Sequence, residues 1–263
     1  MVQKLVLFDK IYNISNQGKK EDIYLRYLKY LKEHVKNFPK TSIRVKKLRK
    51  FDKRFEITIN GPEEVFIFNL LKNEIGTVID FKDVKVNKEY RGSLVDVGKV
   101  GFGLYVDCAI LNPRADVLVN LHSLRKDLCN NNERSLKEII DAYDLIDNFP
   151  MYVKVTKIDL ENNKLQGELT PRTLNFFKKI LDENIEGLFL SGETKGQFKK
   201  VITKKGHFRD IITIKRYGFL ENLALLKEGT DAPGIISAIG SELRNCKLSA
   251  IRPEKINQLF SQN

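Results

Sequence analysis

Aromatic and basic side chains occur together in residues 88–107 (KEYRGSLVDVGKVGFGLYVD), a combination that suits the binding of single-stranded nucleic acid. Every nucleobase has a face on which an aromatic ring can stack, and every phosphate can be neutralised by a lysine or an arginine. Phe102 and Tyr105 are the rings that could stack bases. Because side chains alternate between the two faces of a strand, Tyr105 points outward if Leu104 and Val106 point into a core. We expect both rings to be exposed, and burial in the core is the alternative.

The same segment predicts the long, bent first strand of a small barrel. Its apolar residues do not all follow a two-residue period, so they share one face only if the strand is coiled or bulged. Gly101 and Gly103 supply the backbone freedom that such a bend requires. The elements around this strand must then hold its aromatic residues on an outer surface.

The composition of the chain favours an anionic partner. The 263 residues include 46 Lys and Arg against 34 Asp and Glu, which gives a formal net charge of +12. This excess indicates RNA, DNA or an anionic surface, with a merely soluble, lysine-rich surface as the alternative. No run approaches the ~18 apolar residues that a membrane span requires, and the first residues (MVQKLVLFDKIYN) are too charged for a signal peptide. We therefore expect a cytoplasmic protein without membrane association.

The cysteine and histidine residues are too scattered to suggest a metal site, a disulfide framework or a bound cofactor. No CxxC pair occurs in the sequence, so a zinc ribbon is not indicated. Packing in a reducing compartment is the simplest interpretation of the cysteines. We expect no cofactor and no metal at the residues concerned, which are Cys108, Cys129, Cys246, His34, His122 and His207.

The order of the elements predicts an α+β multidomain protein in three parts. Residues 1–86 follow the order strand, helix, strand, strand, helix, strand, which is typical of a ferredoxin-like βαββαβ unit. The periodicity of the apolar residues predicts helices over 21–38 and 63–73, and strands over 3–12, 42–50, 55–60 and 77–86.

Basic residues crowd the segment between the two central strands of this first part, residues 40–54. Alternation along the strands places Arg44, Lys46 and Arg54 on the outer face of the sheet. They form either a phosphate-binding rim or a solvated hairpin edge, where lysines block unwanted strand pairing. Both interpretations stay open, and the three residues are candidates for contacts with RNA.

Residues 87–170 predict a five-stranded barrel of the OB type. Three short strands are expected over 89–100, 102–110 and 115–124, a helix over 135–146, and then a hairpin whose turn is Asn162-Asn163. Five strands with a helix between the third and the fourth is the order of an OB barrel.

This segment also resembles the RNA-binding OB domain named after the large ribosomal protein S-one. The resemblance covers residues 88–170. It rests on three motifs in the right order, which are VGFGLYVD at 100–107, DVLVNL at 116–121 and VKVTKID at 153–159.

The resemblance implies a set of RNA contacts on the barrel. By it, Phe102 and Tyr105 occupy the two stacking positions. Asn120 stands where the family often has histidine, and His122 is displaced two residues onward. We expect the phosphates beside these residues to be held by Lys88, Arg91 and Lys99.

Residues 171–263 predict a second ferredoxin-like unit, which follows a connecting helix that starts with Pro171. Helices are expected over 194–204 and 231–243, and strands over 187–191, 210–217, 221–227 and 247–252. Asp231 or Thr230 is interpreted as an ordinary helix N-cap, with anion binding at this helix start as the alternative. Basic residues gather in this unit as further candidates for RNA contacts, namely Lys199, Lys200, Lys204, Lys205, His207 and Arg209.

Over nearly its whole length the chain resembles a family of uncharacterised archaeal proteins. The resemblance is carried by an OB unit flanked by α+β units, by GHFRDI at 206–211 and by KEGTDAPG at 227–234. The family brings no established activity. A looser likeness, to the alpha subunit of archaeal initiation factor two, has a different domain order and suggests a translation setting by analogy alone.

These patterns predict a non-catalytic RNA-binding protein of the ribosome, translation or RNA-metabolism machinery. One alternative is a protein-docking assembly factor whose partner is a ribosomal protein or RNA polymerase. A further alternative is an RNA-processing or RNA-modifying enzyme in which His207 acts as an acid or base. We expect no enzyme, because phosphate-loop, dinucleotide, HExxH and GxSxG motifs are absent from the sequence.

Overall fold

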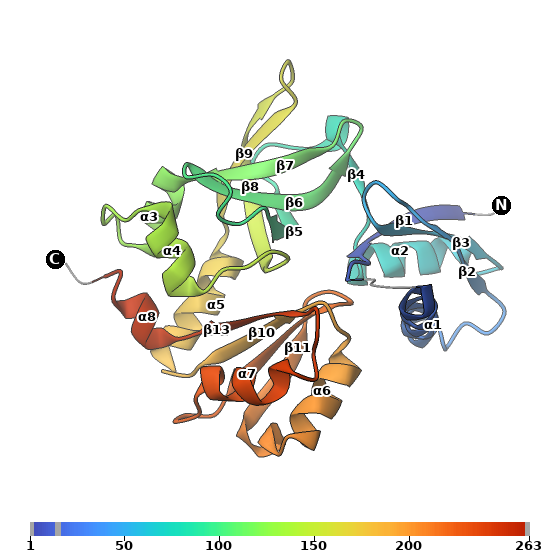
Figure 1. The fold of residues 1–263 in the computed structure, drawn as a ribbon. Coiled ribbons are helices and arrows are strands. Elements are labelled where there is room, and N and C mark those ends of the chain that lie inside the picture. The colour runs from blue at the N-terminus through green and yellow to red at the C-terminus, as the bar shows by residue number, and fades with distance from the viewer. Residues whose placement is uncertain (1–2, 14–16, 261–263) are drawn as a thin grey trace. The chain divides into compact units, whose positions relative to one another are not determined.

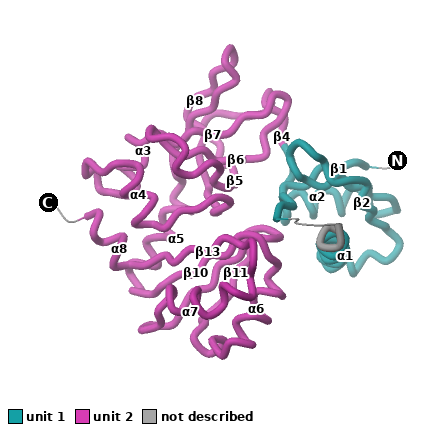
Figure 2. Tube along the Cα trace, viewed as in Figure 1, with its two compact units in different colours: residues 1–78 teal, residues 79–263 magenta. Residues whose placement is uncertain are grey.

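The protein forms two compact units, residues 1–78 and residues 79–263, in a computed structural model (Figure 2). The structure describes residues 3–13 and 17–260, and side chains from residue 21 onward in the second of these ranges. Each unit has its own sheets and helices, and each is described by itself below.

The first unit places a small antiparallel sheet against two helices. Its strand order is β1-β3-β2. Alternate residues of the strands, such as Leu7 and Ile57, are fully buried, and the helices add Leu31 and Leu71 to the same core. The elements are β1 (Gln3–Lys10), α1 (Gln17–His34), β2 (Ser42–Leu48), β3 (Arg54–Asn60) and α2 (Glu64–Glu74).

The last strand expected for this unit, over 77–86, is wrong in its extent. Thr77 makes an isolated antiparallel bridge with Leu7 of β1, which is the position of the fourth ferredoxin-like strand. The chain then leaves the sheet. Ile79–Asp80 (β4) pairs in parallel with barrel strand β6, and Phe81–Asp83 (η1) is a 3-10 helix. Phe81 and Val84 are buried in the core of the second unit, and this burial explains why the segment leaves the first sheet.

The second unit begins with a closed five-stranded OB barrel, as the sequence predicts. Its strands pair in the order β6-β5-β8-β9-β7, and β6 pairs with β7 to close the barrel (Figure 1). The β7–β9 pair is parallel, whereas the other pairs between barrel strands are antiparallel. The strands are β5 (Glu89–Val95), β6 (Gly103–Leu111), β7 (Ala115–Asn120), β8 (Pro150–Asp159) and β9 (Lys164–Leu169).

Two details of the barrel correct the sequence analysis. Residues 88–107 are not one bent strand, because β5 ends at Val95 and β6 begins at Gly103. Strand β7 ends at Asn120, and the residues after it begin a helix. The helices between β7 and β8 are α3 (Leu121–Leu128) and α4 (Leu136–Tyr143), and a capping box at Ser135 and Glu138 starts α4.

The rest of the second unit is a ferredoxin-like βαββαβ arrangement, again as predicted. Helix α5 (Pro171–Asp182) leads from the barrel into an antiparallel sheet of strand order β11-β12-β10-β13. The element bounds are β10 (Gly187–Ser191), α6 (Lys195–Lys204), η2 (His207–Asp210), β11 (Ile211–Arg216), β12 (Glu221–Leu226), α7 (Ala232–Gly240), β13 (Lys247–Ile251) and α8 (Pro253–Asn257).

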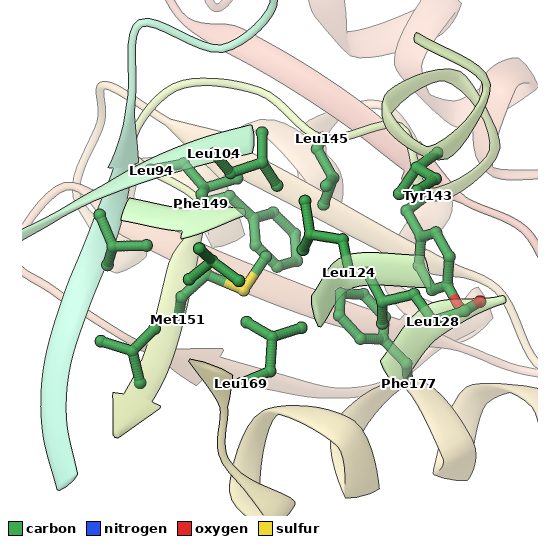
Figure 3. Close-up of a cluster of buried hydrophobic side chains, with 14 of the residues drawn as sticks. Leu94, Leu104, Leu124, Leu128, Tyr143, Leu145, Phe149, Met151, Leu169 and Phe177 are labelled. Carbon is green, nitrogen blue, oxygen red and sulfur yellow. The ribbon is translucent and has the colours of Figure 1, made fainter. Parts of the chain in front are cut away.

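One hydrophobic core spans the barrel and one face of this sheet. Phe149 is fully buried, with its ring centroid 5.9 Å from that of Phe177 in α5 and 4.8 Å from that of Phe189 in β10. Figure 3 shows Phe149 and Phe177 with barrel residues such as Leu94 and Met151. The opposite face of the sheet packs on α6 and α7 (Figure 1). The division of the chain at 86/87 and 170/171 stays a prediction.

None of the helices in the described ranges has both the length and the apolar composition needed to cross a membrane.

Candidate nucleic-acid interface

The strand register of the barrel brings five outward-facing side chains into one row. Residues that pair directly across strands point to the same side of a sheet. Tyr105 pairs with Val95 on one side and with Leu118 on the other, Leu118 pairs with Gln166, and Gln166 pairs with Lys157. The interleaved residues, such as Leu104 and Val106, fill the barrel. We call the row of Val95, Tyr105, Leu118, Gln166 and Lys157 the barrel face.

Phe102 stands beside this row and is exposed, as the sequence predicts. Its side chain is 54% exposed, and its ring meets that of Tyr105 edge to face, with 6.3 Å between the centroids and 85° between the planes. Tyr105 is half-buried. The two rings therefore offer adjoining apolar surfaces at the start of β6.

The backbone around Phe102 is held in place by neighbouring strands. The Leu121 N–H donates a hydrogen bond of 2.8 Å to the Phe102 carbonyl oxygen. Gly103 lies so close to β7 that a Cβ there would collide with the Val119 carbonyl oxygen and the Asn120 Cα. This close approach explains the glycine, and it fixes the direction in which Phe102 leaves the barrel.

The loop between β5 and β6, residues 96–102, adds a lysine beside the rings. Lys99 Nζ lies 2.6 Å from Asp96 Oδ1, and both side chains are largely exposed. The hydrogen bond to Asp96 raises the pKa of the Lys99 ammonium group, so Lys99 is charged at neutral pH. A phosphate can compete for it because exposed ion pairs are weak.

Asp147 holds this loop in place through a hydrogen bond to its backbone. Its Oδ1 accepts a hydrogen bond of 2.9 Å from the Val97 N–H, and its Oδ2 lies 2.7 Å from Lys247 Nζ in β13. Burial by itself raises the pKa of the Asp147 carboxyl, but the hydrogen bonds from Lys247 and Val97, with the charges of Lys247 and Lys99, outweigh it and lower that pKa.

We expect Asp147→Asn to lower the thermal midpoint of the protein at pH 7 by about 2 to 4 °C, which corresponds to about 1 kcal/mol for a partly exposed pair in a domain of this size. The folded pKa of Asp147 is depressed, so its stabilisation is present above the unfolded value of about 3.9 and is lost as pH falls through the folded value. The difference between wild type and variant should therefore shrink once the pH falls below about 3.9. Calorimetry over a pH series from 7 downward measures it, with Asp182→Asn as the exposed control, and a difference of the same size at neutral pH and at the most acidic pH at which both proteins stay folded would contradict the ion-pair account.

Asn120 belongs to strand β7, as expected, and is its last residue, whereas His122 lies outside the strand predicted over 115–124. The Asn120 side chain caps α3, where its Oδ1 accepts a hydrogen bond of 2.8 Å from the Ser123 N–H. His122 is exposed in the first turn of α3 and does not belong to a strand. The correction follows from the cap, because Asn at the first helical boundary satisfies a free backbone N–H. Their contact with RNA stays a prediction.

Lys88 and Arg91 lie away from the barrel face. Lys88 is exposed, with Nζ 5.6 Å from the ring centroid of Tyr90. Arg91 pairs across strands with Tyr152, and its guanidinium group donates to the carbonyl oxygen of Tyr217, the residue that follows β11 of the C-terminal sheet. Arg91 therefore joins the barrel to the C-terminal sheet.

In the first unit, Arg44 and Lys46 are exposed as expected, but the expected exposure of Arg54 is wrong. The Arg54 side chain is only 2% exposed. Its Nε donates a hydrogen bond of 3.1 Å to the Phe8 carbonyl oxygen, and its Nη1 lies 4.0 Å from Asp52. The buried carboxylate of Asp52 lies beside the guanidinium group and holds it inside the unit. Arg54 therefore cannot contact RNA. Lys46 forms an ion pair of 3.1 Å with Glu56, whose pKa is lowered mainly by that hydrogen bond.

The basic residues of the C-terminal unit gather around α6 and η2. Lys199 Nζ lies 5.0 Å from the ring centroid of Phe208, which is 46% exposed. Lys204 and Lys205 share Glu242, at 2.8 and 3.7 Å. The remaining members of this group, Lys200 and Arg209, are exposed.

His207 lies in η2, and its Nδ1 is 2.9 Å from Asp210 Oδ2. This pairing orients the imidazole ring. Catalysis by His207 stays a prediction, as does its contact with RNA. Within residues 3–13 and 17–260, no three His, Cys, Asp or Glu side chains are grouped so that they could hold a metal ion.

The barrel face includes residues that the sequence analysis did not single out. Leu118 and Lys157 lie on the face only because of long-range strand pairing. The alternation within 115–120 (ADVLVN) could have shown that Leu118 points outward, but not that it neighbours Tyr105. Together, the fold and this face define an OB-barrel protein with an exposed aromatic surface, flanked by α+β elements.

Two family models match the second unit one after the other. The DUF2110 central domain matches residues 84–180, and the DUF2110 C-terminal domain matches residues 186–251. The two matches follow each other in chain order and together cover more than half of the chain. The chain therefore belongs to the DUF2110 family. No curated protein matches it.

Several solved structures also match. An uncharacterised protein from Methanocaldococcus jannaschii is 17% identical, covering 34% of this chain and 96% of its own, with a TM-score of 0.24. GSP13 from Bacillus subtilis is 17% identical, covering 33% and 56%, with a TM-score of 0.25. The alpha subunit of aIF2 from Pyrococcus abyssi is 8% identical, covering 65% and 98%, with a TM-score of 0.25. At these TM-scores the likeness carries no argument about function.

Proposed function

We propose that this protein binds single-stranded RNA without catalysing a reaction, and that it does so through the barrel face with Phe102. The observation that carries the proposal is the edge-to-face pair formed by the exposed Phe102 and the half-buried Tyr105 on the outside of an OB barrel. OB barrels bind oligonucleotides on the face of their second and third strands, flanked by the first and last strand loops. Here those strands are β6 and β7, which carry Tyr105 and Leu118.

The chemistry around the rings favours an unpaired strand over a duplex. Stacking requires bases whose faces are free, and a duplex hides them. Lys99 is exposed in the loop that leads to Phe102, and Lys157 is exposed at the other end of the barrel face from Tyr105, so both can neutralise phosphates of a strand that follows the face. The formal charge of +12 adds long-range attraction for a polyanion.

The resemblance of residues 88–170 to the S-one domain supports an RNA of the translation or RNA-metabolism machinery as the partner, and with it a cytoplasmic location. Phosphate contacts from Arg44, Lys46 and the basic residues of α6 and η2 extend the same proposal to the flanking elements.

Binding should be measured by fluorescence anisotropy with an end-labelled single-stranded RNA of ten nucleotides, in a series of salt concentrations. We expect the logarithm of the affinity to fall linearly with the logarithm of the salt concentration, with a slope of about −0.7 for each phosphate contacted. The proposal would be contradicted if the affinity stayed constant from low to moderate salt. It would also be contradicted if a duplex of the same length bound with equal affinity.

Replacing Lys99, in the loop that leads to Phe102, and Lys157, at the end of the barrel face, tests the phosphate contacts separately. Lys99→Gln with Lys157→Gln should reduce the magnitude of the salt slope by about 1.4, which is two phosphates at about 0.7 each. Lys137→Gln, an exposed lysine on α4, is the matched control and should leave the slope unchanged. An unchanged slope in the double variant would show that the phosphates are held elsewhere.

A second candidate function, docking on a protein, is favoured by an apolar patch in the first unit. Val65 and Phe66 on α2 are 58% and 55% exposed, and the Phe66 ring centroid lies 5.0 Å from that of Phe38. Treating a lysate with nuclease before pull-down separates the two functions. Co-purification is abolished if RNA is the partner and persists if a protein is.

A further inference from the structure

A cavity of about 270 Å³ lies where the barrel, α5 and the C-terminal sheet meet in the second unit. Strand β8 contributes Tyr152, α5 contributes Arg172 and Phe176, and β11 and the residue after it contribute Lys215 and Tyr217. The cavity does not include the barrel face. Its volume is slightly below the range of about 300 to 1,000 Å³ that is usual for small-molecule sites.

The walls of the cavity are aromatic. The ring centroids of Phe176 and Tyr217 are 6.4 Å apart with 70° between the planes, and Phe149 lies 6.2 Å from Phe176. Phe149 is fully buried and forms the floor, whereas Tyr152, Phe176 and Tyr217 are half-buried and accessible from the cavity. Such walls suit a flat aromatic ring, which can stack on one ring while another meets its edge.

The mouth of the cavity is cationic. The Arg172 guanidinium carbon lies 3.8 Å from the centroid of the Tyr152 ring, and Lys215 is exposed. Arg172 lies 4.0 Å from Glu89, but both side chains are largely exposed, so this pair is weak. The residues that line the cavity include no carboxylate. An anionic group at the mouth would therefore meet two positive charges.

The cavity is built on rigid elements. The Thr173 hydroxyl accepts a hydrogen bond of 2.8 Å from the Tyr152 N–H and donates one of 3.0 Å to the Tyr152 carbonyl oxygen. The Arg91 guanidinium donates to the Tyr217 carbonyl oxygen and so ties the opposite wall to the barrel. Burial raises the pKa of the Tyr217 hydroxyl, which stays neutral and able to donate a hydrogen bond at physiological pH. Little reorganisation is needed before a ligand enters.

We propose that this cavity binds one nucleoside monophosphate unit, with the base stacked on one of the aromatic rings and the phosphate at Arg172 and Lys215. A nucleotide combines the two features that the cavity complements, a flat aromatic ring and an anion on the same small molecule. Arginine suits this position because its planar group both stacks on Tyr152 and offers paired N–H donors to phosphate. The nucleotide comes either free from solution or as the end of an RNA strand, and only the second source rests on the proposed RNA binding.

The probe for the test is adenosine 5′-monophosphate, with uridine 5′-monophosphate and adenosine beside it, titrated calorimetrically into the full chain. We expect saturable binding of the monophosphates, and binding of adenosine weaker by about tenfold or more. Arg172→Gln and Lys215→Gln should each weaken the monophosphates by about tenfold. Lys178→Gln, an exposed lysine on the same helix as Arg172, is the matched control and should change nothing.

Competition with an oligoadenylate of ten nucleotides distinguishes the two sources. If the monophosphate and the oligonucleotide displace each other in a manner that requires Arg172, the strand end enters the cavity. If both bind at once, the ligand is a free nucleotide. The proposal is overturned if neither monophosphate and no oligonucleotide end shows saturable binding. It is also overturned if neither Arg172→Gln nor Lys215→Gln changes the binding. Phe102→Ala with Tyr105→Ala should leave monophosphate binding unchanged, so a failure of the proposed RNA function is seen separately.

Discussion

Phe102→Ala combined with Tyr105→Ala is expected to weaken the binding of single-stranded RNA by about 1 to 3 kcal/mol for each base that the rings stack, about 5- to 160-fold per base. The reason is geometric. The two rings meet edge to face at 6.3 Å and present adjoining surfaces outside the barrel. Phe102 is 54% exposed, so removing it takes little packing away from the core. The loss should appear in anisotropy titrations with the protein still folded.

The salt dependence of this double variant separates stacking from charge. Alanine at both positions removes rings but no cation, so affinity should fall while the salt slope stays as in the wild type. Phe102→Tyr with Tyr105→Phe keeps both rings and should keep most of the affinity. Phe66→Ala removes a ring that is 55% exposed on α2 of the first unit and belongs to none of the proposed RNA contacts, and it serves as the control.

Two results would contradict this account. If the double variant unfolds, the rings are structural. If affinity is unchanged, the barrel is a scaffold and the basic residues around α6 and η2, together with Arg44 and Lys46, make the contacts.

The barrel was predictable from sequence because its determinants are local. Alternation in the strand segments, the turn at Asn162-Asn163 and the helical period within 135–146 are each readable over a few residues, and their order defines an OB barrel. The exposure of Phe102 and the outward direction of Tyr105 were predictable for the same reason, but the half-buried state of Tyr105 was not. The helix that follows Asn120 was also signalled, since asparagine is a favoured N-cap, but the apolar run that continues to Leu121 concealed it.

Arg54 shows where a local pattern is insufficient. Its charge and its place in a lysine-rich segment indicated an outer position, yet it is buried against Phe8 and beside Asp52. Burial of a charge is tolerated when partners satisfy it, and those partners come from another strand and a turn. A sequence does not show such pairing in advance.

The sequence of β10 carried a sign of the core that the barrel and the C-terminal sheet share, but this sign is a continuous apolar run and not an alternation. Every residue of β10 (GLFLS) is buried, whereas a strand with one solvent face would alternate. Phe189 faces the barrel core, and Leu188 and Leu190 face α6 and α7. A continuous apolar strand indicates a sheet covered on both sides. It does not reveal that one of the covers is the preceding barrel.

The second large effect is expected from Phe149→Ala, which should destabilise the whole second unit by about 3 to 5 kcal/mol. Phe149 is 1% exposed and contacts rings of α5 and β10 while its carbonyl oxygen accepts a hydrogen bond from the Leu94 N–H of β5. The cavity left behind would lie where the barrel meets the C-terminal sheet. Native-state hydrogen exchange should show protection falling by about 10²-fold or more in β5–β9 and β10–β13 alike.

This joint loss decides whether residues 79–263 fold as one cooperative unit or as separate domains divided at 170/171. Polar contacts already link the two halves, since Asp144 accepts hydrogen bonds of 2.5 Å from the Ala250 N–H and Asn148 donates one of 3.1 Å to Ser191. Leu31→Ala, in the core of the first unit, is the control and should lower protection in β1–β3 alone. If Phe149→Ala left one of the two sheets of the second unit fully protected, the halves would unfold independently, and the predicted boundary at 170/171 would hold as a true domain boundary.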